Sequence, residues 1–141
     1  MKNLQILLVE DNEGDIILTQ EAFEECDFKT SIHVARNGKE AITYLFDSCT
    51  NTQLPDLILL DINLPLLNGH EVLKRIKENE KTKHIPVVIL TTSSASTDIN
   101  LTYANHANSF ISKPSEIDDF FQSINTLGKF WFNTCKLPLN K

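Results

Sequence analysis

The chain has 141 residues, of which 41% are hydrophobic and 23% charged, a composition typical of one globular domain with its own core. Its net charge of −6 disfavours binding to nucleic acid and to anionic membrane surfaces. The three cysteines form no CxxC pair, and there is neither a signal-peptide pattern nor an apolar run of the roughly 20 residues that a membrane span needs, so we expect a cytoplasmic protein with reduced thiols.

Short apolar runs alternate with segments of helical periodicity along the whole chain. This alternation predicts a doubly wound α/β domain with a parallel sheet. The run Leu57–Leu60 is continuously aliphatic, as is usual for a strand that is buried on both faces. The predicted strands are Gln5–Glu10, Ser31–Ala35, Leu57–Asp61, Val87–Leu90 and Ser109–Ser112.

Three helix starts carry a capping signature, in which a polar residue is followed three positions later by an acidic one. Asn-Gly also occurs in hairpin turns, but helical periodicity follows both Asn-Gly pairs, so we interpret them as helix starts. The capping pairs are Asn37 with Glu40, Asn68 with Glu71, and Ser115 with Asp118.

The last predicted helix carries one apolar stripe at helical spacing, which we expect to be buried. Phe130 and Phe132 fall outside this stripe. The stripe consists of Ile117, Phe120, Phe121, Ile124, Leu127 and Trp131.

Reactive side chains follow four of the predicted strands. Glu10 and Asp11 end the first, Asp61 ends the third, Thr91 follows the fourth, and Lys113 follows the fifth. Each feature by itself is commonplace, since acids decorate helix starts and polar residues fill loops. In a parallel α/β sheet, however, the ligand site lies outside the carboxyl ends of the strands. The coincidence of all four features therefore predicts one pocket.

The chemistry of these side chains indicates phosphoryl transfer. Three neighbouring carboxylates are unfavourable without a cation, and Mg²⁺ binds carboxylates together with phosphate oxygens. Lys113 adds a point charge suited to phosphate, and Thr91 adds a hydroxyl. A carboxylate such as Asp61 is a suitable nucleophile for forming an aspartyl phosphate.

From Gln5 to Leu127 the chain resembles the receiver domains of two-component response regulators, in the CheY-like superfamily. This resemblance implies a flavodoxin-like (βα)5 fold with a five-stranded parallel sheet in the order 2-1-3-4-5. It also implies a phosphoacceptor with at most slow self-dephosphorylation, and not an enzyme. The matching signature consists of Glu10-Asp11, Asp61 with Asn63 and Pro65, Gly69, Thr91, and Lys113-Pro114.

The resemblance also implies a role for each matching residue. Asp61 would accept phosphate from a sensor histidine kinase, and Thr91 and Lys113 would bind the phosphoryl oxygens. The magnesium ligands would be Glu10, Asp11, Asp61 and the backbone carbonyl of Asn63.

A conformational switch is implied as well, in which Thr91 moves toward the phosphoryl group and the aromatic side chain at position 110 turns inward. Here that residue is Phe110, where many receivers carry Tyr, so switching would depend on packing without a hydroxyl. The family further suggests a cis Lys113–Pro114 bond, although the base rate for cis X–Pro is only about 5%.

Details of the loops and the C-terminal segment resemble the small stand-alone regulators of phytochrome-type kinases. That narrower resemblance implies a red or far-red light signal and a homodimer. We expect a single receiver domain over 1–141, with 128–141 as a C-terminal helix extension and tail. Phe130, Trp131 and Phe132 in this extension would form the dimer interface, unless they fold back on their own core. The segments are Val9–Asn12, Gly14-Asp15, Leu18–Ala22, Leu90–Ser94, Phe130-Trp131 and Leu137-Pro138.

Other functions fit the sequence less well. Phosphatases of the aspartyl-phosphate type carry a second Asp two residues after the nucleophile, where this chain has Asn63. A nucleotide or flavin module needs a glycine-rich phosphate loop, and the first predicted strand is followed by acids instead. A pseudo-receiver that binds partners without phosphorylation remains the alternative.

Overall fold

The computed structural model describes residues 3–26, 29–48, 54–134 and 136–138. Five parallel strands form one sheet in the order β2-β1-β3-β4-β5, which confirms the predicted fold. The strands are β1 (Asn3–Val9), β2 (Lys29–Ala35), β3 (Leu57–Leu60), β4 (Val87–Thr91) and β5 (Ser109–Ser112). The first two strands begin earlier than predicted, while Glu10 and Asp61 lie just beyond their strands. Two of the cysteines, Cys49 and Cys135, lie outside the described residues.

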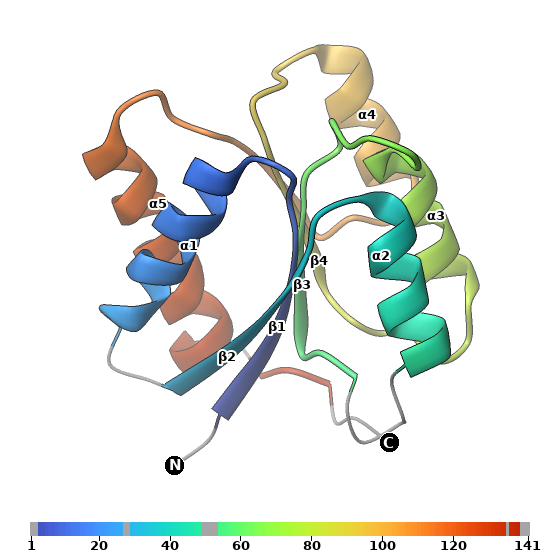
Figure 1. Cartoon of the computed structure of the whole chain (residues 1–141), viewed down its shortest axis with the longest axis horizontal. Coiled ribbons are helices and arrows are strands. Elements are labelled where there is room, and N and C mark those ends of the chain that lie inside the picture. Colours follow the sequence, from blue (N-terminus) through green and yellow to red (C-terminus); the bar gives the residue numbers. More distant parts are fainter. Residues whose placement is uncertain (1–2, 27–28, 49–53, 135, 139–141) are drawn as a thin grey trace.

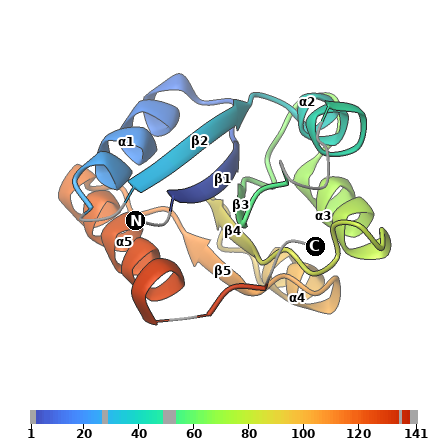
Figure 2. The same cartoon turned by 90° about the horizontal axis from the view of Figure 1, so that it is seen from below.

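Helices cover both faces of the sheet. Figure 1 shows α1 and α5 together on one face, and α2, α3 and α4 on the other, and the view from below in Figure 2 shows the same two layers. The helices are α1 (Glu13–Glu24), α2 (Gly38–Thr43), α3 (Gly69–Glu78), α4 (Ser96–Ala104) and α5 (Ile117–Lys129). A π-helical turn extends α2 (Tyr44–Ser48) and another extends α5 (Phe130–Thr134). Within the described part of the chain, no helix is both long and apolar enough to span a bilayer.

The two helix layers explain why β3 is aliphatic at every position. Successive side chains of a strand point to opposite faces. Leu57 and Leu59 belong to the core cluster under α1 and α5, while Ile58 and Leu60 belong to the cluster under α2 and α3. All four side chains are fully buried, as predicted for a strand covered on both faces.

The capping predictions hold for two helices and are wrong for the third. The side chains of Asn37 and Asn68 accept hydrogen bonds from backbone N–H groups three residues later. The last helix instead begins at Ile117, and its cap residue, Glu116, makes no side-chain cap bond. Ser115 precedes the cap, so it is not placed to act as the capping residue of this helix. Ile117, predicted to be buried, is 62% exposed because the helix begins at this residue, beyond the edge of the core.

A glycine brings α3 against the loop that follows β3. A Cβ atom on Gly69 would lie 2.3 Å from the Cα of Ile62 and 2.5 Å from the carbonyl oxygen of Asp61. Both neighbours are backbone atoms, which cannot move aside as a flexible side chain would. Because Gly69 has no side chain, α3 can begin in contact with the backbone of Asp61 and Ile62.

We expect Gly69→Ala to lower the free energy of unfolding by about 2–3 kcal/mol, because the added methyl group displaces backbone. Urea denaturation would measure this loss. Gly14→Ala in α1 is the matched control, since its new Cβ would meet only the flexible Asn12 side chain at 3.3 Å. We expect a change below about 1 kcal/mol there. Equal losses in the two variants would contradict the close-approach argument.

Candidate functional site

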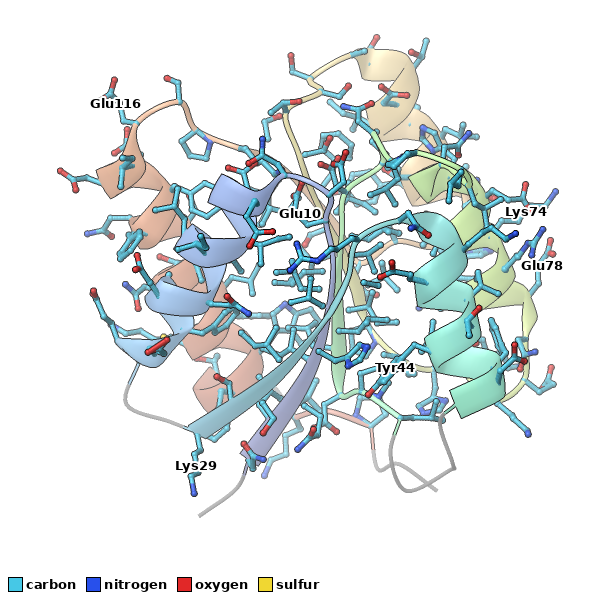
Figure 3. All side chains as sticks on the ribbon, in the orientation of Figure 1. Glu10, Lys29, Tyr44, Lys74, Glu78 and Glu116 are labelled. Atoms are coloured by element: carbon cyan, nitrogen blue, oxygen red, sulfur yellow. The ribbon has the colours of Figure 1, made fainter. Side chains whose placement is uncertain are left out.

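The parallel register places the acids at one edge of the sheet. Val9 of β1 pairs with Leu60 of β3, so the residues that follow them leave the sheet side by side. The backbone N–H of Asp61 donates to the carbonyl of Val9 at 3.0 Å, and that of Glu10 donates to Ala35 at 2.9 Å. Figure 3 labels Glu10 at this end of β1, opposite the end where Lys29 begins β2.

Glu10, Asp11 and Asp61 form a group in which each residue offers one carboxylate oxygen, and these three oxygens lie within 4.8 Å of one another. Glu10 and Asp61 are 3% and 6% exposed, whereas Asp11 is exposed to solvent. A compact set of hard oxygen donors with one open side suits Mg²⁺, which keeps several waters and accepts substrate oxygens. The donor set therefore fits the metal that the sequence predicts.

Lys113 lies between the carboxylates and neutralises part of their charge. Its Nζ donates to Glu10 at 2.5 Å, to Asp15 at 2.8 Å and to Asp61 at 3.2 Å, and the lysine side chain is 4% exposed. The participation of Asp15 was not predicted. Asp15 belongs to α1, and only the tertiary packing of α1 brings it to the lysine.

The Lys113–Pro114 peptide bond is trans, so the cis bond that the family suggested is wrong for this structure. The trans form is intrinsically favoured by about 0.5–1 kcal/mol. With this trans bond, the backbone N–H of Lys113 donates to the carbonyl of Thr91 at 2.7 Å, and its ammonium reaches all three carboxylates. No cis bond is needed to place the lysine in the site.

Burial and ion pairing shift the pKa values of two groups in this cluster. Burial raises the pKa of Glu10 to about 7, against the opposing effect of its hydrogen bond with Lys113. Burial alone would lower the pKa of Lys113, but its bonds with Asp15 and Glu10 raise it above the usual range. The lysine therefore stays charged at neutral pH, which is the state needed to attract phosphate.

Thr91 and Asn63 bond to Oδ1 of Asp61, the carboxylate oxygen that does not face Lys113. The Thr91 hydroxyl donates to Asp61 Oδ1 at 2.7 Å, and the backbone N–H of Asn63 donates to the same oxygen at 2.9 Å. The Asn63 side chain donates to the Thr91 hydroxyl at 3.3 Å. Oδ2 faces Lys113, so the carboxylate is bonded on both oxygens and has a fixed orientation. The metal-binding role of the Asn63 carbonyl stays a prediction.

Phe110 lies in β5, three residues before Lys113, and is half-buried against the core under α2 and α3. Its backbone N–H donates to the hydroxyl of Tyr103 in α4 at 3.0 Å. This contact joins α4 to the backbone of β5, and no local pattern in the sequence marks it.

A series of hydrogen bonds connects the loop that follows Thr91 to two helices. The Ser93 hydroxyl donates to Asp98 of α4 at 2.6 Å, and Nε2 of His70 in α3 lies 2.9 Å from the other oxygen of Asp98. Both bonds lower the pKa of the Asp98 carboxyl, and the bond from Ser93 has the larger effect. These hydrogen bonds connect the loop after Thr91 with α4 and, through Asp98, with α3.

The predicted interface residues lie apart from this site, where α5 ends. Phe130 is 49% exposed, whereas Trp131 and Phe132 are half-buried against the core under α1 and α5. The rings of Phe130 and Trp131 meet edge to face with centroids 5.3 Å apart. Two of the three aromatic side chains thus fold back on their own core, and Phe130 points outward.

The fold and the site together define a receiver-type phosphoacceptor class, in which an acid group, a lysine and a hydroxyl surround one aspartate. Residues 6–125 match the sequence profile of the response regulator receiver domain. The chain belongs to this response regulator receiver domain family.

The chain is also similar to individual proteins and to solved structures. The chain is 40% identical to a protein from Methanothrix harundinacea, the probable methanogenesis regulatory protein FilR2, over 94% of this chain and 86% of that protein. It is 38% identical to response regulator Rcp1 from Synechocystis, over 94% and 92% of the two chains. A crystal structure of the phosphorylated cyanobacterial phytochrome response regulator RcpA superposes with a TM-score of 0.93 at 41% identity, covering 98% of this chain and 100% of that one. A Mn²⁺-bound structure of Rcp1 superposes with a TM-score of 0.90 at 37% identity, covering 96% and 99%.

Proposed function

We propose that Asp61 is the residue that accepts the phosphoryl group in this receiver domain. The observation that carries the proposal is the convergence of Thr91 and Lys113 on opposite oxygens of the Asp61 carboxylate. Asp61 is 6% exposed and follows a central strand, so the surrounding structure fixes its orientation. A fixed nucleophile with a cation and a hydroxyl beside it meets the main needs of phosphoryl transfer, which are positioning and charge neutralisation.

In the reaction, a carboxylate oxygen of Asp61 attacks the phosphorus of a phosphohistidine. The new O–P bond forms as the N–P bond breaks, and the electron pair of that bond leaves with the imidazole of the kinase. Lys113 and the Thr91 hydroxyl donate to the oxygens of the transferred group. Mg²⁺ held by Glu10, Asp11 and Asp61, with the Asn63 carbonyl, would neutralise the charge that these carboxylates and the phosphoryl group bring together.

Phosphorylation is proposed to act on the rest of the molecule through Thr91 and Phe110. The Thr91 hydroxyl, which donates to Asp61 in the structure, would donate to a phosphoryl oxygen instead. This movement would shift the loop that contains Ser93, and Ser93 is hydrogen-bonded to Asp98 of α4. Phe110 adjusts by packing, because its side chain has no hydroxyl of its own.

The relatives support a sensor histidine kinase as the partner, and we propose a phytochrome-type kinase in the cytoplasm. RcpA is described as a phytochrome response regulator, and it superposes on this chain almost completely. We further propose that residues 1–141 act as one receiver unit, with 128–141 as an extension of the last helix. The protein would act as a stoichiometric phosphoacceptor with at most slow self-dephosphorylation.

A homodimer formed through the end of α5 is also proposed. Phe130 is exposed, and it borders a groove of about 620 Å³ between α5 and the edge strand β5. Ile111 and Leu127 contribute apolar surface to the same groove. An exposed aromatic next to an apolar groove is a common feature of protein interfaces.

We expect Phe130→Lys to yield a monomer with unchanged secondary structure, because a charge in an apolar interface is unfavourable. Light scattering coupled to size exclusion would measure the mass. Removal of the residues after Gly128 should also yield a monomer, but it exposes core surface under Trp131, so the point substitution is the cleaner variant. A dimer that persists in Phe130→Lys would exclude this interface.

Incubation with Mg²⁺ and acetyl phosphate, followed by intact mass measurement, tests the proposed function. We expect a gain of one phosphoryl group per chain that disappears when the metal is chelated. Magnesium binding without any gain would point to a site that accepts phosphate only from its kinase, and labelling by a purified phytochrome-type kinase would then decide. Absence of both binding and labelling would favour the pseudo-receiver.

A further inference from the structure

Asp15 is a partner of Lys113 that the phosphoryl chemistry described above does not use. Its carboxylate accepts a hydrogen bond from Nζ of Lys113 at 2.8 Å, and the two side chains are 25% and 4% exposed. Asp15 does not belong to the acidic group formed by Glu10, Asp11 and Asp61. It therefore bonds the lysine from outside the proposed metal site.

The number of donors on the Lys113 ammonium shows what its bond with Asp15 can do. A lysine ammonium has three N–H donors, and Lys113 directs them to Glu10, Asp15 and Asp61. Two of these acceptors are proposed to change when the site is used, because Glu10 contributes to metal binding and Asp61 takes the phosphoryl group. Asp15 is the acceptor that does not change. The bond to Asp61, at 3.2 Å, is also the longest of the three and the first that a phosphoryl oxygen would replace.

The backbone around Asp15 is held on both sides. Its N–H donates to the side chain of Asn12, the capping residue of α1, at 2.9 Å. Its carbonyl accepts from the hydroxyl of the buried Thr19 at 2.7 Å. The next residue, Ile16, is 1% exposed and belongs to the core under α1 and α5. The backbone of Asp15 is therefore held in place at the start of α1, which sets the position from which its carboxylate reaches Lys113.

We infer that Asp15 is a positioning residue for phosphoryl transfer, which holds the Lys113 ammonium in place while its bond to Asp61 is exchanged for one to the phosphoryl group. This inference rests on the proposed function of Asp61. It assigns to α1 a part in orienting the lysine of the loop that follows β5. Lys113 then presents one donor to the phosphoryl group without a search among its rotamers.

The rate of labelling by acetyl phosphate tests the inference. We expect Asp15→Ala to label about tenfold more slowly than the unaltered chain, the effect of one lost charge-assisted hydrogen bond. Asp15→Asn keeps an acceptor oxygen and should recover most of the rate. Asp118→Ala is the matched control, because Asp118 is also an acid in the first turn of a helix but is exposed. An Asp15→Ala variant that labels as fast as the unaltered chain, or faster, would overturn the inference.

A double-mutant cycle separates positioning from a purely structural role. In a Lys113→Ala background we expect Asp15→Ala to change the labelling rate by less than about twofold, because the residue acts only through the lysine. Equal slowing in both backgrounds would instead assign Asp15 to the stability of α1. The same cycle measured by urea unfolding without metal needs no labelling. If the unaltered chain takes phosphate neither from acetyl phosphate nor from a kinase, the proposed function fails. Coupling between positions 15 and 113 in the unfolding cycle then still decides whether Asp15 holds the lysine.

Discussion

Asp61→Asn is expected to abolish labelling by acetyl phosphate and by a kinase, while the fold stays intact. The amide keeps an oxygen for the bonds from Thr91 and from the Asn63 backbone, so the local geometry has no reason to change. The amide is not nucleophilic, and it removes one of the charges that bind the metal. Intact mass measurement at saturating Mg²⁺ and phosphodonor would detect any residual phosphate.

Two further measurements make this result interpretable. We expect the free energy of unfolding of Asp61→Asn, without metal, to lie within about 1 kcal/mol of the unaltered chain, since the loss of its pairing with Lys113 is offset by less repulsion of Glu10. Asp119→Asn, an exposed acid of α5, is the control and should label at the full rate. Full labelling of Asp61→Asn would mean that another residue is the acceptor.

Lys113→Ala is expected to lower the free energy of unfolding more than Asp61→Asn does. Removal of the lysine leaves Glu10, Asp15 and Asp61 without their shared cation, and loss of one partner of a buried ion pair costs about 3–5 kcal/mol. We expect a loss of about 3 kcal/mol for the metal-free protein at pH 7, because Asp15 is partly solvated. Mg²⁺ should recover part of this loss by replacing the missing positive charge.

The effect of Lys113→Ala should depend on pH. The raised pKa of Lys113 keeps it charged at both pH 5 and pH 7, so its own contribution is present at both. Glu10, with a pKa raised to about 7, is protonated at pH 5 and no longer needs the lysine there. The difference in unfolding free energy between the two proteins should therefore shrink as the pH falls from 7 to 5. A difference that grows instead would show that the carboxylates are not the partners that matter.

In function, Lys113→Ala should still take up phosphate, more slowly, without any change in self-association on phosphorylation. The nucleophile and the acid group remain, but the cation that senses the phosphoryl group is gone. Lys83→Ala is the control, because Lys83 forms an exposed ion pair with Glu80. Such pairs contribute at most about 1 kcal/mol, so we expect little change in stability or labelling.

Much of this site could be predicted from the sequence because the information is local. An aliphatic strand followed by an acid, a threonine after the next strand, and a lysine after the last are read from neighbouring residues. The rule that parallel strands present their carboxyl ends at one edge then brings these residues together. The capping of α2 and α3 was predictable for the same reason, since a cap involves residues three positions apart. It was wrong at α5, where Ser115 lies one residue too early.

The sequence by itself therefore determined the alternation of strands and helices, the residues at the strand ends and the chemistry that they support, while the strand order was implied by the resemblance to receiver domains. The tertiary structure alone decided which side chains complete the site. Asp15 reaches Lys113 because α1 packs on the same face as α5, and Tyr103 reaches the backbone of Phe110 because α4 lies against β5. It also decided that Phe132, which falls outside the predicted apolar stripe of the last helix, packs on the core. Contacts of this kind join residues on different elements, and they depend on the angle and depth at which helices pack, which hydrophobic periodicity does not specify.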